Sequence, residues 1–498
     1  MKIILYLTTF FLLPEVMAAR LNISKPNIML ILSDQQRWDF DGMHFPMNMP
    51  NLRRLTNEGT TFSQAFCPSP LCAPSRNALA AGREHRDMKA YYSNAINPSY
   101  PIGRIVTFYE ALRKAGYHTM SSGKDDLTKE KQDRDAIIKK SKANMKSLGF
   151  ADFERTLGKR NTIGTPPRPR DTYGLYLKSR NDISVNGHSI NGFEALQKSY
   201  NNKVGSKTSH AYRSFLPDDI YEDNFVAQVT LNLYRRRPSH KPWYLQVNFP
   251  GPHDPFAITA KMEASVSSRS FGKPTKASSL TPAKRKEVDL GRQFYGAEVE
   301  NLDRLLGILL KEIKDEEHRT IICYSSDHGD MLGDDGKWGK QVAAQGSVAV
   351  PLICRGPGIL SGHMVHGPVA TLDLAATFLD YAKAARPIGM TSRSLRSVFS
   401  GAPHTSVVRT TVQSALKNWV LHIISVPVHD LKSNDIDESE HIQIQREARY
   451  GFISVRVLGS NCQNPLLLAA DNSVLRLRSL PKEIIDRTCR ILRSPSNA

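Results

Sequence analysis

The stretch "KPNIMLILSDQQRWDFDG", residues 25–42, decides the predicted fold because an apolar strand in it ends abruptly in polar residues. Ile28–Leu32 is a continuous apolar run, which is typical of a strand that is buried on both faces of a parallel sheet. Asp34 and Gln35 follow almost at once. Ligands of open α/β sheets bind beyond the carboxyl ends of the strands. The stretch therefore predicts a parallel strand and a polar sheet edge at which chemistry can take place.

The same order of helix, strand and polar loop recurs along the chain. A helix is expected to end at Lys114, and a strand over residues 117–121 then leads to Lys124. Further strands are predicted over residues 243–249, before His253, and over residues 320–325, before Asp327 and His328. A helix of about five turns is expected before the latter strand. This order predicts an α/β fold with a large, mostly parallel (mixed) sheet between helices, and one site shared by the strand ends.

Other parts of the chain have a different character. Residues 127–215 and 257–285 show weak periodicity and are predicted to be insertions over the site face or mobile loops. Beyond residue 385, short apolar runs suggest a smaller C-terminal α+β subdomain with an antiparallel sheet. We therefore expect a catalytic domain over residues 25–385 and a subdomain over residues 386–498.

Composition limits the class of protein. The chain has 498 residues, 40% hydrophobic and 23% charged, so it can bury a sizeable core. Its net charge of +19 favours acidic partners such as nucleic acid, an anionic membrane or a sulfated polymer. Because the basic runs are short and scattered, we expect solvated faces and no nucleic-acid partner.

The N-terminus predicts entry into the secretory pathway. Residues 1–18 have the layout of a signal peptide, and their apolar stretch is too short to span a membrane. Asn22 opens a sequon for an N-glycan. The six cysteines are too few for a disulfide scaffold. We expect a lysosomal or extracellular protein without a membrane span; the oligomeric state stays open.

Two groups of strand-end residues suggest chemistry. Asp34, Gln35, Asp327 and His328 could hold a divalent cation, largely through oxygen ligands, or could merely cap loops. The cationic or imidazole side chains Lys124, Lys340 and His253 suit a tetrahedral oxyanion, although each could also be a surface or structural residue.

Cys72 lies between Pro70 and Pro74 at the start of a predicted helix. The positive end of a helix dipole depresses a thiol pKa, which favours a thiolate nucleophile. A disulfide with Cys67 is the alternative.

The segment Cys72-Ala-Pro-Ser-Arg76 resembles the C-x-P-S-R signature of the sulfatase family, whose cysteine is oxidised to formylglycine. "PNIMLILSDQQRWD", "GYHTMSSGKDD", "PHDPF", "YSSDHGDMLGDDGKWGKQ" and "VPLICRGPG" resemble further family segments in the expected order. The resemblance spans about residues 25–385, and "TSRSLRSVFSG" just beyond is also similar.

The resemblance implies a sulfuric ester hydrolase and a role for each residue. Asp34, Gln35, Asp327, His328 and the modified Cys72 would bind one divalent metal, Ca²⁺ in most of the family, with Mg²⁺ or Mn²⁺ as alternatives. Cys72, as a formylglycine hydrate, would attack sulfur, and Arg76 would hold the hydrate. Lys124 and Lys340 would bind sulfate oxygens, and His253 would contact the sulfate and serve the leaving oxygen. A formylglycine-generating enzyme becomes a partner during maturation.

The chain departs from the family pattern at several positions. Gln35 and His328 stand where many members have an acid and an asparagine, and Asp126 stands where many have a histidine. The Asp126 variant resembles the arylsulfatase K branch, and the C-terminal part diverges. A sulfated glycan or aryl sulfate is the expected substrate. A phosphoesterase or phosphonate monoester hydrolase of the same fold is one alternative, and a catalytically weak secreted binder of sulfated polysaccharide is another.

Overall fold

The fold is that of a computed structural model, which describes most of the chain up to residue 402 and parts of the remainder. The described ranges are residues 25–91, 100–128, 142–163, 167–205, 210–275, 277–402, 411–416, 419–427, 452–458, 466–468 and 474–475. The predicted signal peptide and Asn22 lie outside these ranges. Within them, no helix is both long and apolar enough to cross a bilayer.

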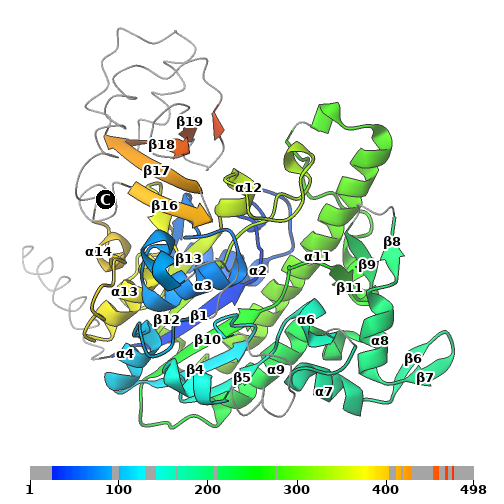
Figure 1. Cartoon of the computed structure of the whole chain (residues 1–498), viewed down its shortest axis with the longest axis horizontal. Coiled ribbons are helices and arrows are strands. Elements are labelled where there is room, and N and C mark those ends of the chain that lie inside the picture. Colours follow the sequence, from blue (N-terminus) through cyan, green and yellow to red (C-terminus); the bar gives the residue numbers. More distant parts are fainter. Residues whose placement is uncertain are drawn as a thin grey trace, which may run out of the picture.

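A central eight-stranded sheet forms the middle layer, in the order β14-β2-β13-β12-β1-β10-β4-β5 (Figure 1). Its strands are β1 (Asn27–Ser33), β2 (Thr60–Phe62), β4 (His118–Gly123), β5 (Asp152–Arg155), β10 (Trp243–Phe249), β12 (Thr320–Ser326), β13 (Leu352–Arg355) and β14 (His363–Val365). The five strands from β12 to β5 are parallel to their neighbours, whereas β13 is antiparallel to β12 and to β2. The predicted mixed, mostly parallel sheet is therefore confirmed.

Helices cover both faces of this sheet, so alternate residues of β1 enter two different apolar cores. Leu30 belongs to one apolar cluster and Ile31 to the other. Helices α3 (Cys72–Ala81), α4 (Phe108–Lys114) and α13 (Asp373–Tyr381) pack on the first face, and α2 (Pro50–Glu58), α9 (Glu222–Arg235) and α11 (Pro282–Glu312) on the second. In Figure 1, α4 and α13 lie on one side of the central strands and α9 and α11 on the other.

Helix α11 is 31 residues long, so the expectation of about five turns is wrong. Its first turns carry the charged sequence "PAKRKE" and are exposed, and they therefore lack the apolar periodicity by which a helix is recognised. Thr281 caps the helix by accepting a hydrogen bond from the Lys284 amide, and Pro282 occupies the first turn.

The stretch 127–215 is not a set of loops where it is described. It supplies β5 to the central sheet and forms a third apolar cluster around Tyr173, Leu177 and Phe193. The small elements here and nearby are α6 (Lys159–Ile163), α7 (Thr172–Ser179), β6 (Ile183–Val185), β7 (His188–Ile190), α8 (Gly192–Ser199), β8 (Lys203–Val204), β9 (Ala211–Arg213), β11 (Phe256–Ile258) and α10 (Ala260–Val266). Their brevity explains the weak periodicity.

A second, five-stranded antiparallel sheet follows the main fold, as predicted. It consists of β16 (Thr411–Leu416), β17 (Trp419–Pro427), β18 (Phe452–Leu458), β19 (Leu466–Leu468) and β20 (Val474–Leu475). The Ala415 amide donates to the Pro68 carbonyl, so β16 lies against the segment that precedes α3. The boundary at residue 385 stays a prediction. The remaining short elements are β3 (Ala65–Phe66), α12 (Gln345–Val348), β15 (Val369–Ala370) and α14 (Arg396–Phe399).

Candidate active site

Four neighbouring parallel strands deliver the predicted residues to one edge of the sheet. Asp327 directly follows β12, Asp34 follows β1 and Lys124 follows β4. The strand between β1 and β4, β10, leads into the loop of His253. Parallel strands in register end at the same level, so these side chains meet. Gly123 is required here, because a Cβ at this position would lie 1.9 Å from the Asn248 carbonyl oxygen.

Cys72 is the first residue of α3, and its sulfur is surrounded by predicted site residues. Sγ lies 3.1 Å from Lys340 Nζ, 3.2 Å from His328 Nε2, 3.6 Å from Asp34 Oδ1 and 3.8 Å from Lys124 Nζ. Figure 1 places α3 beside the ends of the central strands. The structure thus brings the cysteine, both lysines and the metal-ligand candidates into one cluster.

The expectation of a lowered Cys72 thiol pKa is wrong, and the alternative of a disulfide with Cys67 is excluded. The Cys72 pKa is raised to about 11, because burial and the Asp34 carboxylate outweigh Lys124 and Lys340. The thiolate that the start of the helix favours is therefore not the form of this thiol at neutral pH. Cys72 and Cys67 are both buried free thiols, so they form no disulfide with each other. Within the described residues a disulfide joins Cys323 and Cys354 on adjacent strands β12 and β13.

Arg76 is buried one turn after Cys72 and ties the strand ends together. Its guanidinium donates to Asp327 Oδ2 at 2.8 Å, to Asp34 Oδ2 at 3.2 Å, to the Lys124 carbonyl at 2.6 Å and to Asn248 Oδ1 at 3.1 Å. Two carboxylates share this one guanidinium, and Lys124 supplies a second cation to Asp34.

Asp34, Cys72, Asp327 and His328 place one ligand atom each within 4.8 Å of one another, and all four are buried. The His328 Nδ1 lies 3.0 Å from the Gly329 carbonyl oxygen and therefore carries the proton. Nε2 then directs its lone pair at Asp34 and Asp327, 3.9 and 3.6 Å away. Burial lowers the His328 pKa to about 4, so this imidazole is neutral. A neutral imidazole facing two carboxylates fits a bound cation.

Gln35 lies beside this cluster in a left-handed conformation, with φ 73°. The backbone amide of Gln35 donates to Asp327 Oδ1, and the Tyr295 hydroxyl donates to the backbone carbonyl oxygen of Gln35. Non-glycine residues adopt this conformation rarely, and here the surrounding hydrogen bonds hold it. The side-chain Oε1 accepts from Lys340 Nζ at 2.6 Å, while Nε2 donates to Asp330. The structure thus directs the Gln35 oxygen at Lys340.

Lys124 and Lys340 are both oriented by oxygen atoms. Lys124 Nζ lies 2.6 Å from Asp34 Oδ2 and 3.5 Å from Asp126 Oδ2. Although burial opposes it, the Asp34 charge raises the pKa of Lys124, and the Cys72 and Asp34 groups raise that of Lys340. Both ammonium groups stay charged and point at the same sulfur.

Two buried residues, Asp223 and Lys159, hydrogen-bond the backbone of the His253 loop. Asp223 accepts the Gly251 amide at 2.8 Å, and a Cβ at Gly251 would lie 2.6 Å from the Asp223 carboxylate. Lys159 Nζ donates to the Pro255 carbonyl at 3.1 Å and to Glu298 Oε1 at 2.6 Å. Burial, together with Lys340 and Lys124, lowers the His253 pKa to about 3, so its imidazole is neutral.

Sequence reasoning missed Asn248, Asp330, Lys159 and Asp223. Asn248 could have been noticed, because Gln246 and Asn248 interrupt the apolar run of β10 at alternate positions. Lys159 and Asp223 carry no such signal, since one lies in a weakly periodic stretch and the other in the first turn of a helix.

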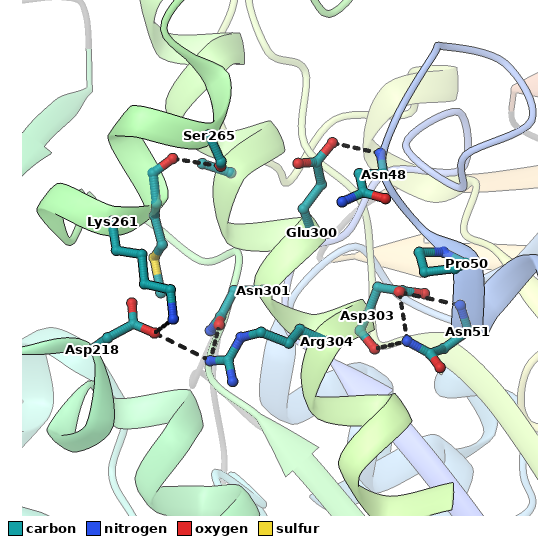
Figure 2. Close-up of a pocket in the computed structure, with 12 residues that line it drawn as sticks. Asn48, Pro50, Asn51, Asp218, Lys261, Ser265, Glu300, Asn301, Asp303 and Arg304 are labelled. Atoms are coloured by element: carbon teal, nitrogen blue, oxygen red, sulfur yellow. Dashed lines mark hydrogen bonds and ion pairs between the residues drawn. The ribbon is translucent and has the colours of Figure 1, made fainter.

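A separate polar pocket of about 250 Å³ lies between α10, α11 and the start of α2 (Figure 2). It contains none of the site residues. Its polar groups bond one another: Arg304 pairs with Asp218, and the Asn51 amide donates to Asp303. This pocket is therefore not the candidate active site.

A buried cluster of two carboxylates, an imidazole, two lysines and a cysteine at the strand ends of an α/β sheet suits the hydrolysis of an anionic ester. The sulfatase family model matches residues 26–384, and the chain belongs to the sulfatase family of sulfuric ester hydrolases.

Relatives agree with this assignment, and a solved structure shares the fold. The chain is 27% identical to a choline-sulfatase of Rhizobium meliloti, over 72% of this chain and 68% of that protein. It is 24% identical to an arylsulfatase K of Danio rerio, over 76% and 70%. A phosphonate monoester hydrolase from Silicibacter pomeroyi matches the fold with a TM-score of 0.61 at 18% identity, covering 91% of this chain and 88% of the other.

Proposed function

We propose that this chain is a formylglycine-dependent sulfatase that hydrolyses sulfate esters of glycans or aryl sulfates. The observation that carries the proposal is the position of Cys72. It stands in the Cys-Ala-Pro-Ser-Arg segment, and its sulfur is the point on which Lys340, His328, Asp34 and Lys124 converge.

The environment of Cys72 favours a modified residue over a thiolate nucleophile. A thiol whose pKa is raised to about 11 is almost fully protonated at neutral pH. Oxidation to an aldehyde, followed by hydration, gives two hydroxyl groups at this position. One hydroxyl attacks sulfur. Loss of the proton from the other hydroxyl then expels sulfate and regenerates the aldehyde. A plain cysteine has no second hydroxyl and would release sulfate from the covalent intermediate slowly. Arg76, one turn along α3, is proposed to hold the hydrate.

Asp34, Asp327 and His328, with Gln35 and the modified Cys72, are the proposed ligands of one divalent metal. Ca²⁺ is the proposed ion, with Mg²⁺ or Mn²⁺ as alternatives, because oxygen ligands favour hard cations and an imidazole favours transition metals. When bound, the metal would lower the pKa of the attacking hydroxyl and offset charge on the sulfate.

The two lysines and His253 are proposed to act on the transferred group. Lys124 and Lys340 remain charged beside Cys72 and can stabilise the sulfate oxygens as negative charge develops. His253, neutral in the unliganded chain, can contact the sulfate and assist the departure of the leaving oxygen as an acid–base group.

The substrate class and the cellular location rest on relatives. One matched structure is titled as a complex with D-glucosamine-2-N,6-O-disulfate, and one relative is named an extracellular sulfatase. We propose a sulfated glycan as substrate, maturation by a formylglycine-generating enzyme, and a lysosomal or extracellular location.

Parallel assays test the reaction class. Chain from a host that makes formylglycine should hydrolyse 4-nitrophenyl sulfate, and Cys72→Ala should abolish this activity. Hydrolysis of 4-nitrophenyl phosphate or a phosphonate monoester in preference to the sulfate would favour the phosphoesterase alternative. No turnover of any ester, combined with salt-sensitive heparin binding that survives Cys72→Ala, would favour the binder.

A further inference from the structure

An exposed arginine lies at the rim of the candidate active site, outside the cluster around Cys72. Arg160 stands on α6, its side chain is 60% exposed, and its Nη2 lies 3.8 Å from Asp254 Oδ2. Asp254 directly follows His253, and the His253 ring nitrogen Nδ1 lies 3.4 Å from Asp254 Oδ1. Arg160 is thus one ion pair away from a residue proposed to contact the transferred sulfate.

The neighbouring Lys159 is a buried structural cation, and its contacts differ from those of Arg160. Lys159 is buried and bonds Glu298 and the Pro255 carbonyl at short distance. The Arg160–Asp254 pair is long and exposed, and such pairs contribute only about 0–1 kcal/mol. Arg160 can therefore turn from Asp254 to an anionic ligand at little cost.

The rim around Asp254 is electropositive. Although burial opposes it, the nearby His253, Lys340, Arg160 and His210 lower the pKa of Asp254 to about 2. The His253 imidazole is neutral and burial lowers the pKa of His210, so Lys340 and Arg160 are the two cations that face this one carboxylate. An anionic group of a ligand would be attracted to the same place.

An aromatic wall of His210, Trp338 and Phe256 lies near Asp254. The His210 ring stacks on Trp338 with centroids 4.6 Å apart, and Trp338 precedes Lys340 by two residues. Phe256 contacts the other rings of this wall, with its centroid 6.2 Å from that of Trp338. This wall borders the same carboxylate as Arg160, because His210 and Arg160 both lower the pKa of Asp254.

We propose that Arg160 binds a second anionic group of the substrate, a carboxylate or a further sulfate, next to the sulfate ester that is hydrolysed. This inference rests on the proposed function and narrows its substrate class to glycans with at least two anionic groups. A guanidinium suits either group because it can donate two parallel hydrogen bonds to a carboxylate or a sulfate.

Binding to chains that carry Cys72→Ala tests the proposal without turnover. Calorimetry would compare three defined disaccharides: one with a single sulfate and no other anion, one with a sulfate and a carboxylate, and one with two sulfates. The variants are Arg160→Ala, Arg160→Lys and the control Arg235→Ala. Arg235 is 58% exposed, pairs with Glu312 at the end of α9, and changes the net charge equally.

A charged hydrogen bond of about 1.5–3 kcal/mol corresponds to a preference of tenfold or more for a dianionic ligand. Arg160→Ala should abolish this preference, Arg160→Lys should keep part of it, and Arg235→Ala should keep it whole. The disaccharide that loses more affinity identifies the anion. Equal affinity for all three ligands, or a preference that survives Arg160→Ala, would overturn the proposal. The proposed function fails separately, if chain with Cys72 intact turns over no sulfate ester.

Discussion

The ammonium nitrogen of Lys340 lies 3.1 Å from the sulfur of Cys72, although the two residues are 268 positions apart in the chain. The same nitrogen donates a hydrogen bond to the side-chain oxygen of Gln35, 2.6 Å away, and this bond orients it. A charged donor fixed at this distance from the reacting atom is what a transferring sulfate needs, because its oxygens gain charge there.

Lys340→Ala should therefore lower kcat/KM for 4-nitrophenyl sulfate by about 100-fold, the usual effect of removing one preorganised donor. Lys337→Ala is the matched control, because Lys337 lies three residues away and is exposed. Steady-state kinetics of both variants would check this. Equal activity of the two variants would show that Lys340 does not act in the reaction.

His328→Asn should change which metal the site prefers. An imidazole favours transition metals and an amide oxygen favours hard cations, so Mn²⁺ should bind at least about tenfold more weakly while Ca²⁺ binding changes little. Thermal unfolding of chelator-treated protein, titrated with each ion, measures both. His318→Asn, at an exposed position, is the control. Unchanged Mn²⁺ binding would mean that His328 is not a ligand.

Glu298→Gln should flatten part of the pH dependence of stability. Burial raises the Glu298 pKa to about 7 in spite of its ion pair with Lys159. A raised carboxyl pKa means that the folded chain binds more protons than the unfolded chain. This contribution is therefore full below about pH 4.5 and is lost as pH rises to about 7, by about 3 kcal/mol in total.

The readout is the unfolding free energy of each variant from pH 4 to 8. The slope should differ between wild type and Glu298→Gln, whatever constant offset the altered Lys159 pair adds. Glu312→Gln, on the same helix but partly exposed, should keep the wild-type slope above about pH 5, because the hydrogen bond to Arg235 lowers the Glu312 pKa and its contribution is complete there. Parallel curves for wild type and Glu298→Gln would show that Glu298 does not titrate in this range.

The sequence predicted the strands well because burial on both faces leaves an uninterrupted apolar run. β10 was expected at residues 243–249 and is observed at Trp243–Phe249. The polar residues after these strands were expected to share a site, and Asp34, Lys124 and Asp327 do lie together. Here parallel register converts a pattern in the sequence into proximity in space.

Other features depend on tertiary contacts that no local pattern reports. The Cys72 pKa follows burial and the Asp34 charge, which outweigh the helix start seen in the sequence. The supports of the His253 loop, Lys159 and Asp223, come from short elements whose partners are distant in the chain. Helix α11 was underestimated because its first turns are solvated and carry no apolar face.

The central claim is that Cys72 becomes formylglycine, and the mass of one peptide tests it most directly. Trypsin releases residues 55–76, "LTNEGTTFSQAFCPSPLCAPSR", which contain both Cys67 and Cys72. After reduction and alkylation of chain from a competent secretory host, Cys67 should be alkylated and Cys72 should have the mass of an aldehyde. Alkylation of both cysteines in an active preparation would contradict the account.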